Sequence, residues 1–205
     1  MLHIICALKH EARLIINRYQ LLQAGSALGF TTYSNKDSGV SLTVTGVGKQ
    51  HAADGTEFAA DFHEAREHDA WLNIGIAGHR SVPIGTLVLA NKITDVESQQ
   101  VWYPHCPFPT SLDTLPLTTV AQPAVFYLEH DMMDMEAGGF FRSACRYSPL
   151  DLIHSLKIIS DNEAHPPARI SKQSVLDLFD ANLMEIDQLV TQLRLHSEVS
   201  ATAKP

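Results

Sequence analysis

The sequence lacks the features of a membrane protein and of a secreted, disulfide-bonded one. Its 205 residues contain no run of about 18 apolar residues, the length that a membrane-spanning helix requires. The apolar segment "LHIICAL" (2–8) is followed at once by Lys9, His10 and Glu11, so it is too short for a secretory signal. The three cysteines cannot all pair and form no C-x-x-C motif. We therefore expect a cytoplasmic protein with reduced thiols and no membrane partner.

Several motifs of common enzyme classes are also missing. The chain has neither a G-x-x-x-x-G-K-[ST] phosphate loop nor a G-x-S-x-G nucleophile elbow, and "GVGKQHA" (46–52) lacks the third glycine of a dinucleotide fingerprint. The two histidines of "HEAREH" (63–68) are five residues apart rather than four, which turns them away from each other on a helix. We therefore expect no metal site.

The charge balance argues against a nucleic-acid partner. Acidic residues outnumber basic ones by 23 to 15, and the net charge of −8 does not favour binding to polyanions. The apolar fraction of 45% and the charged fraction of 19% are typical of a globular protein. We expect a single domain over residues 1–197, followed by a disordered tail over 198–205.

Apolar, β-branched segments alternate with amphipathic ones along the chain. This alternation predicts an α/β domain with a largely parallel sheet covered by helices on both faces. The interval 99–115 is irregular and contains prolines, as expected of a lid or an interface segment. The predicted strands are 2–8, 41–48, 70–78, 85–94, 117–125 and 154–160, and the predicted helices are 9–22, 49–68, 134–147 and 171–196, the last capped by Ser171.

Acidic residues and glycines gather where the predicted strands end. Ligands of open α/β sheets bind beyond the carboxyl ends of the strands, so these residues are candidates for one site. Each has an ordinary structural explanation when taken alone: an acid in a first helical turn, a turn residue, a tight glycine turn. The candidates are Glu11 after the first strand, Gly75, Ala77 and Gly78 at the end of the third, and Ser160 and Asp161 at the end of the last.

Glu136 is the acid that a structural role explains least well. In the predicted helix its spacing places it beside Met132, Met133 and Phe140, on an apolar face where an unpaired carboxylate is costly. Together with Glu11 and Asp161 it suggests several carboxylates around a neutral pocket. Such a set suits cleavage of a glycosidic bond, in which one acid activates water and another protonates the leaving group.

These motifs resemble those of the purine nucleoside phosphorylase and nucleosidase family, most closely its 5′-methylthioadenosine/S-adenosylhomocysteine nucleosidase branch. The resemblance implies a three-layer α/β/α sandwich with a mostly parallel, twisted sheet, and a purine nucleosidase that needs no metal or organic cofactor. The matching segments are "IICALKHEA", "TGVGKQHAA", "NIGIAGH…IGTLVLANKITD", "DMEAGGFF" and "LKIISDN", which span residues 4 to about 162 in the family's order.

The resemblance also assigns roles to individual residues. It implies that Glu11 activates water and that Asp161 protonates the purine, whereas Met135 packs against the sugar and Glu136 binds its hydroxyls. The residues implied for the base and nucleophile pocket are Gly75, Ile76, Ala77, Gly78, Phe126 and Ser160.

Two alternatives to hydrolysis remain open. Phosphorylases of the family hold phosphate with arginines and a serine, where this chain has Asn73 and Ile76, so water is favoured as the nucleophile. Phosphorolysis, a glycosyl transfer to inorganic phosphate, would need cations from elsewhere. Arg13, Lys49, His79 and Arg80 are the alternative sources.

The second alternative is a degenerate, non-enzymatic nucleoside-binding protein. Only about ten residues separate Phe126 from Glu136, where nucleosidases carry a longer segment with an aromatic that stacks on the base. Phe126 or Tyr127 is the candidate for that stacking. The resemblance also implies a homo-oligomer, with a dimer favoured and 99–115 as the candidate contact.

Overall fold

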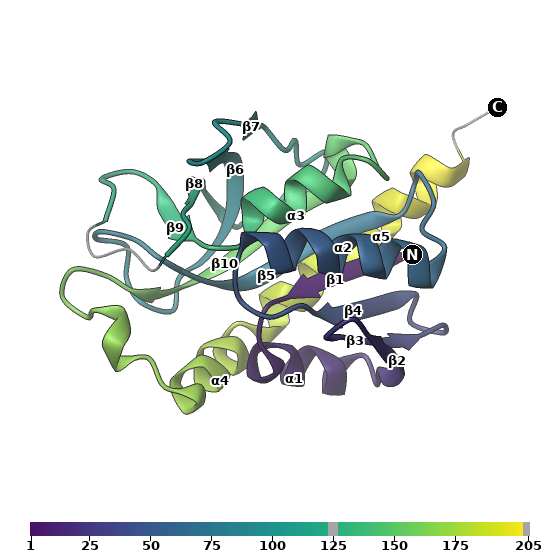
Figure 1. Ribbon diagram of the computed structural model, residues 1–205, viewed down its shortest axis with the longest axis horizontal. Helices are drawn as coiled ribbons and strands as arrows, with labels where there is room; N and C mark the ends of the chain where they lie inside the picture. The colour runs from purple at the N-terminus through teal and green to yellow at the C-terminus, as the bar shows by residue number, and fades with distance from the viewer. Residues whose placement is uncertain (123–126, 203–205) are drawn as a thin grey trace.

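A computed structural model describes residues 1–122 and 127–202 (Figure 1). Strands and helices alternate over most of the chain, so the predicted α/β class is confirmed. The strands are β1 (Leu2–Cys6), β2 (Leu22–Ala27), β3 (Phe30–Asn35), β4 (Val40–Val44), β5 (Ala70–Gly78), β6 (Leu87–Asp95), β7 (Val101–Trp102), β8 (Asp113–Thr119), β9 (Met132–Asp134) and β10 (Ile153–Asp161). The helices are α1 (Lys9–Arg18), α2 (Lys49–His63), α3 (Ala137–Ala144), α4 (Lys172–Ala181) and α5 (Leu183–Thr202), with short 3₁₀ turns at Leu150–Leu152 and Pro167–Arg169.

The strands form one mixed sheet, so the prediction of a mostly parallel sheet was wrong. Strand β1 pairs in parallel with β4 and β5, and β5 with β10, but β2, β3 and β4 form an antiparallel meander and β6 runs antiparallel to β10. The short β9 pairs with both β5 and β8, and β8 pairs with β6. Strands β5, β10, β6, β8 and β9 therefore close into a ring at one end of the sheet.

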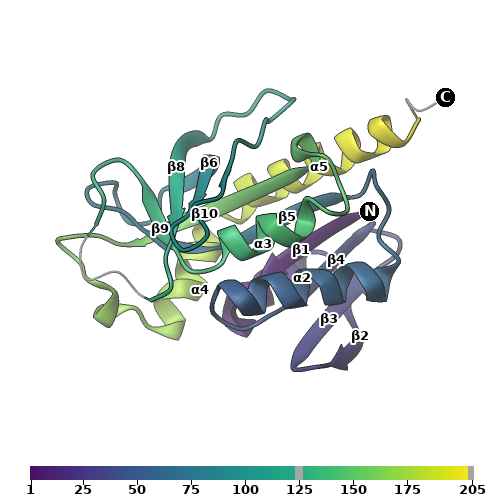
Figure 2. The same cartoon turned by 45° about the horizontal axis from the view of Figure 1, so that its top comes forward.

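Helices cover both faces of the sheet (Figure 2). One core cluster joins α1, α4 and α5 to the strands through residues such as Ile15, Phe179 and Leu193. A second cluster joins α2 and α3 to the opposite face through Ala59 and Phe141. Burial of apolar side chains on both faces explains why β1 and β5 read as nearly continuous apolar segments.

The predicted closing helix 171–196 is in fact two helices. Ser171 caps α4 as expected, its hydroxyl accepting a hydrogen bond from the Ser174 N–H at 3.0 Å. The chain then turns at Asn182, whose amide donates to the carbonyl of Gly85. Helix α5 continues to Thr202, so residues 198–202 are helical rather than disordered. No helix in the described part of the chain is long and apolar enough to cross a membrane.

Two further segments differ from the expectation. The hairpin of β2 and β3 was missed because residues 22–35 are polar and contain glycines, without the apolar run that identified the other strands. The predicted helix 134–147 was also wrong at its start: Met132–Asp134 forms β9, and α3 begins only at Ala137. Glu136 lies in the connection between them, so the prediction that it lies on an apolar helix face was wrong.

The two glycines of "EAGGFF" allow α3 to pack closely on its surroundings. A Cβ atom on Gly139 would lie 1.9 Å from the carbonyl oxygen of Lys49, at the start of α2. A Cβ on Gly138 would lie 3.0 Å from the Cβ of Asp95. This close approach brings the loop before α2 against the start of α3, next to Glu136.

We predict that Gly139→Ala lowers the free energy of unfolding by about 1 to 3 kcal/mol, because the added methyl group meets a backbone atom that cannot rotate away. Urea unfolding followed by circular dichroism measures the change. Arg142→Ala, on the exposed side of the same helix, is the matched control and should change it by less than about 0.5 kcal/mol. Equal stability of Gly139→Ala and wild type would contradict the close packing.

Candidate active site

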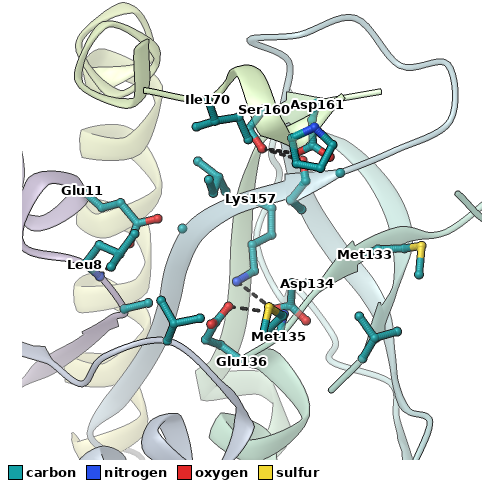
Figure 3. A pocket seen from close by; sticks show the side chains of 18 of the residues that line it. Leu8, Glu11, Met133, Asp134, Met135, Glu136, Lys157, Ser160, Asp161 and Ile170 are labelled. Atoms are coloured by element: carbon teal, nitrogen blue, oxygen red, sulfur yellow. Dashed lines mark hydrogen bonds and ion pairs between the residues drawn. The ribbon is translucent and has the colours of Figure 1, made fainter. Parts of the chain in front are cut away.

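A pocket of about 200 Å³ opens at the carboxyl ends of β1, β5 and β10 (Figure 3). The sequence analysis named ten site residues, and nine of them line this pocket. They are Glu11, Gly75, Ile76, Ala77, Gly78, Met135, Glu136, Ser160 and Asp161. The tenth, Phe126, lies outside the described residues. Predicted site residues from four separate stretches of the chain thus meet in one cavity.

Glu11 lies in the first turn of α1, and its side chain is buried. One carboxylate oxygen, Oε2, accepts a hydrogen bond from the Leu8 N–H at 2.9 Å and lies 3.5 Å from the thiol of Cys6. Burial raises the pKa of Glu11 to about 7, with a smaller contribution from the negative charge of Glu136. A carboxylate with this pKa is suited to take a proton near neutral pH.

Glu136 reaches the pocket from the connection between β9 and α3. Its Oε1 accepts a hydrogen bond from the Gly48 N–H at 2.8 Å, and its Oε2 accepts one from the Met135 N–H at 3.3 Å. Gly48 has a φ of 109°, a conformation that L-residues with side chains rarely adopt, so the second glycine of "GVG" sets the direction of this N–H. Burial raises the pKa of Glu136, as does the nearby charge of Asp134.

The pocket also contains a buried lysine that the sequence analysis did not single out. Lys157 lies in the middle of β10, is 1% exposed and forms an ion pair with Asp134, with 2.8 Å between Nζ and Oδ2. Burial lowers the pKa of Lys157, but the charges of Asp134, Glu136 and Glu11 raise it above its usual value. A charged residue inside the apolar strand segment "HSLKIIS" was the available signal.

Gly75 leaves open the space between Lys157 and Glu11. The two residues Gly75 and Lys157 are partners in the β5–β10 register. A Cβ on Gly75 would lie 3.6 Å from Lys157 Nζ and 3.6 Å from Glu11 Oε1, so this point is within reach of both an ammonium and a carboxylate. A water molecule at this point would have a cation to hold it and a base to deprotonate it.

Asp134 is the second residue that the sequence analysis missed. Its Oδ1 accepts a hydrogen bond from the Thr119 hydroxyl at 2.7 Å, and its Oδ2 accepts one from the Ala137 N–H at 2.9 Å as well as from Lys157. Thr119 in turn accepts from the Gly138 N–H. Asp134 thus connects β8, β10 and the start of α3, and holds Lys157 toward Glu136.

Asp161 ends β10 on the other side of the pocket from Glu11 (Figure 3). Its Oδ1 accepts a hydrogen bond from the Ser160 hydroxyl at 2.5 Å. Its Oδ2 accepts one from the Tyr127 hydroxyl at 2.6 Å. The pocket therefore presents the Glu11 carboxylate on one side and a carboxyl group held by two hydroxyls on the other, and Met135 and Glu136 also line it.

The histidine-containing segments of the described chain do not form a metal centre. No group of three histidine, cysteine, aspartate or glutamate side chains within residues 1–122 and 127–202 is arranged to hold a metal ion. Helix α2 ends at His63, so "HEAREH" is not a continuous helix, and His63 instead bonds the Thr32 hydroxyl at 2.8 Å.

We predict that Glu11→Gln makes the protein more stable above pH 7. The pKa of Glu11 rises from 4.5 to about 7 on folding, so between these pH values the folded state binds more protons than the unfolded state, and wild-type stability falls as pH rises. Above pH 7 the buried charge of Glu11 lowers the free energy of unfolding by about 3 kcal/mol, a cost that is absent for the neutral amide of glutamine.

Urea unfolding of both proteins at pH 4.5 and pH 8 tests this prediction. The stability difference in favour of Glu11→Gln should grow between these values, whereas Glu64→Gln, which changes an exposed acid, should show no such growth. A difference that is the same at both pH values would show that Glu11 is not buried as a proton-binding group.

The fold is that of known nucleosidases. No protein-family pattern and no curated protein matches the sequence, but solved structures do. The 5′-methylthioadenosine nucleosidase of Arabidopsis thaliana, in its apo form, has a TM-score of 0.77 at 15% identity, over 94% of this chain and 95% of that one. The 5′-methylthioadenosine/S-adenosylhomocysteine nucleosidase of S. pneumoniae, with a transition-state inhibitor, has a TM-score of 0.67 at 17% identity, over 94% of this chain and 97% of that one. The corresponding nucleosidase of Helicobacter pylori has a TM-score of 0.69 at 13% identity, over 91% of this chain and 97% of that one.

Proposed function

We propose that the protein hydrolyses the N-glycosidic bond of a purine nucleoside. The observation that carries this proposal is the meeting of Glu11, Glu136 and Asp161 in a single pocket. Three acids at these positions provide a base, a partner for sugar hydroxyls and a donor to a leaving group. The likeness to nucleosidase structures, one of them in complex with 8-aminoadenine, supports this choice of substrate class.

The geometry supports a specific division of roles. Water held near Gly75 by Lys157 gives a proton to Glu11 as its oxygen attacks C1′ of the sugar. The bond from C1′ to the base breaks, its electron pair leaves with the purine, and Asp161 delivers a proton to the purine ring. Positive charge develops on the sugar in the transition state and is stabilised by Glu136, which also accepts hydrogen bonds from the 2′- and 3′-hydroxyls.

Electrostatics favour water over phosphate as the nucleophile. The described lining of the pocket contains four carboxylates and a single lysine or arginine, Lys157, which is already paired with Asp134. The amide of Asn73 is occupied by the Ile5 carbonyl and the Ser155 hydroxyl. A phosphate dianion would therefore meet net negative charge. None of the four alternative cation sources lines the pocket: Arg13, Lys49, His79 and Arg80.

The finer expectations from the family resemblance form part of the same proposal. We infer a three-layer α/β/α arrangement, a cytoplasmic homodimer, and catalysis without a metal or organic cofactor. Exposed apolar side chains in the 99–115 segment, Val101 and Tyr103, support its role as a subunit contact. Gly75, Ile76, Ala77, Gly78 and Ser160 would surround the nucleophile and the base.

We predict that incubation with 5′-methylthioadenosine or adenosine yields adenine and the free sugar at the same rate with and without phosphate. Chromatography of the products measures this, and Asp161→Asn should lower the rate at least about 100-fold because it removes the leaving-group acid. Glu64→Gln is a surface control. Ribose 1-phosphate formed only with phosphate would show a phosphorylase, and binding without turnover would show a nucleoside-binding protein.

We also predict that kcat/KM rises with pH up to about 7 and then levels off. Glu11 acts as a base only when ionised, and its pKa is raised to about 7 by burial. Below that value the ionised fraction falls about tenfold for each pH unit. Steady-state rates at low substrate concentration between pH 5 and 8.5 give this profile, and a constant kcat/KM over that range would remove Glu11 from the base role.

A further inference from the structure

Tyr127 makes a contact that the roles above do not use. Its hydroxyl donates a hydrogen bond to Asp161 Oδ2 at 2.6 Å, and its ring lines the pocket. The sequence analysis named Tyr127 only as a candidate for stacking on a base. In the structure its polar end instead meets the carboxyl group that would protonate that base, and burial next to Asp161 raises the pKa of the phenol.

The backbone is shaped to accept this contact. A Cβ on Gly78 would lie 2.5 Å from Asp161 Oδ2 and 2.7 Å from a ring carbon of Tyr127. Any side chain at position 78 would therefore displace one of the two groups. The absence of a side chain at Gly78 allows both Asp161 and the Tyr127 ring to lie against the strand.

The contact gives each of the two Asp161 oxygens a hydroxyl donor. Ser160, its neighbour on β10, donates to Oδ1 at 2.5 Å, and Tyr127 donates to Oδ2. Ser160 is 7% exposed and its hydroxyl also lies 3.4 Å from the Ala77 carbonyl on the neighbouring strand, so its side chain is held in position at the end of β10. Tyr127 is only half-buried and comes from a separate loop. Of the two donors, Tyr127 is the one that an incoming ligand can replace.

We propose that the Tyr127 hydroxyl occupies, in the ligand-free protein, the Asp161 oxygen that a purine must reach, and so competes with the base. This inference rests on the proposed function. It makes Tyr127 a residue that sets the affinity for nucleosides and free bases, without acting on ligands that fill only the sugar part of the pocket. The state that can bind the base is the one in which Tyr127 has released Asp161. The apparent affinity for the base is the intrinsic affinity multiplied by the fraction of molecules in that state.

Calorimetric titration with adenine tests the proposal. Tyr127→Phe keeps the ring but removes the competing donor, so the Kd for adenine should fall about fivefold to tenfold. Ser160→Ala is the matched control, because it removes the other hydroxyl donor from the same carboxyl group, and it should not tighten adenine binding. The affinity for methyl ribofuranoside, which has no base, should be unchanged in Tyr127→Phe.

The ligand-free contact can be measured separately from binding. Urea unfolding of Tyr127→Phe, Asp161→Ala and the double variant forms a double-mutant cycle. We expect the two substitutions to be non-additive by at least about fivefold in the unfolding equilibrium constant, since each removes the same hydrogen bond. Additive effects would show that the bond is absent in solution and would overturn the proposal.

The binding outcomes separate this proposal from the proposed function. If wild-type protein binds adenine but Tyr127→Phe binds it equally or more weakly, Tyr127 is not a competitor and this inference is wrong. If neither protein binds adenine and neither cleaves nucleosides, the base site itself is wrong and the proposed function fails with it.

Discussion

The ion pair between Lys157 and Asp134 is the interaction on which the rest of the site depends. A lysine that is 1% exposed in the centre of a sheet needs a buried anion, because an isolated charge there would cost several kcal/mol. Asp134 provides it at 2.8 Å and also accepts from the Ala137 N–H, which fixes the start of α3 relative to β10. The position of Glu136, two residues after Asp134, follows from this anchoring.

The excess of carboxylates around this one cation determines the chemistry of the pocket. Lys157 is close to Asp134, Glu136 and Glu11, and burial together with mutual repulsion raises the pKa of both glutamates. Clusters of this kind reduce stability and are characteristic of functional sites rather than of structural cores. A neutral, hydroxyl-rich ligand can donate hydrogen bonds to the carboxylates and accept one from the lysine without adding negative charge. A dianion would add two negative charges to the pocket.

Backbone hydrogen bonds and glycines then align the remaining parts. The Gly48 N–H reaches Glu136 only because α2 and α3 approach each other closely at Gly139. Gly78 performs a similar function for Asp161 and Tyr127 at the other end of the pocket. Gly78, which the sequence analysis placed in the site, thus also determines how Asp161 and Tyr127 lie, a role that no sequence pattern distinguishes.

Sequence reasoning expected Glu11 and Asp161 to lie near each other because each follows an apolar strand, and the parallel pairing of β1, β5 and β10 does bring both to one pocket. It reached Glu136 through a helix that does not exist at that position, and it missed Asp134 and Lys157. Asp134 and Lys157 are 23 residues apart in the chain, and the pairing of both β9 and β10 with β5 brings them together. The antiparallel pairing of β6 with β10 was missed for the same reason, whereas the β2–β3 hairpin was missed because its sequence is polar and lacks an apolar run.

The sequence by itself determined the α/β class, the core strands β1, β5 and β10, and the set of acids at their ends, because these depend on local apolar patterns and chain order. Tertiary structure alone decided the mixed sheet with its closed ring, the pairing of Lys157 with Asp134, and the contact of Tyr127 with Asp161. Those features depend on which distant segments become neighbours, and that is set by packing of the whole chain rather than by any local pattern.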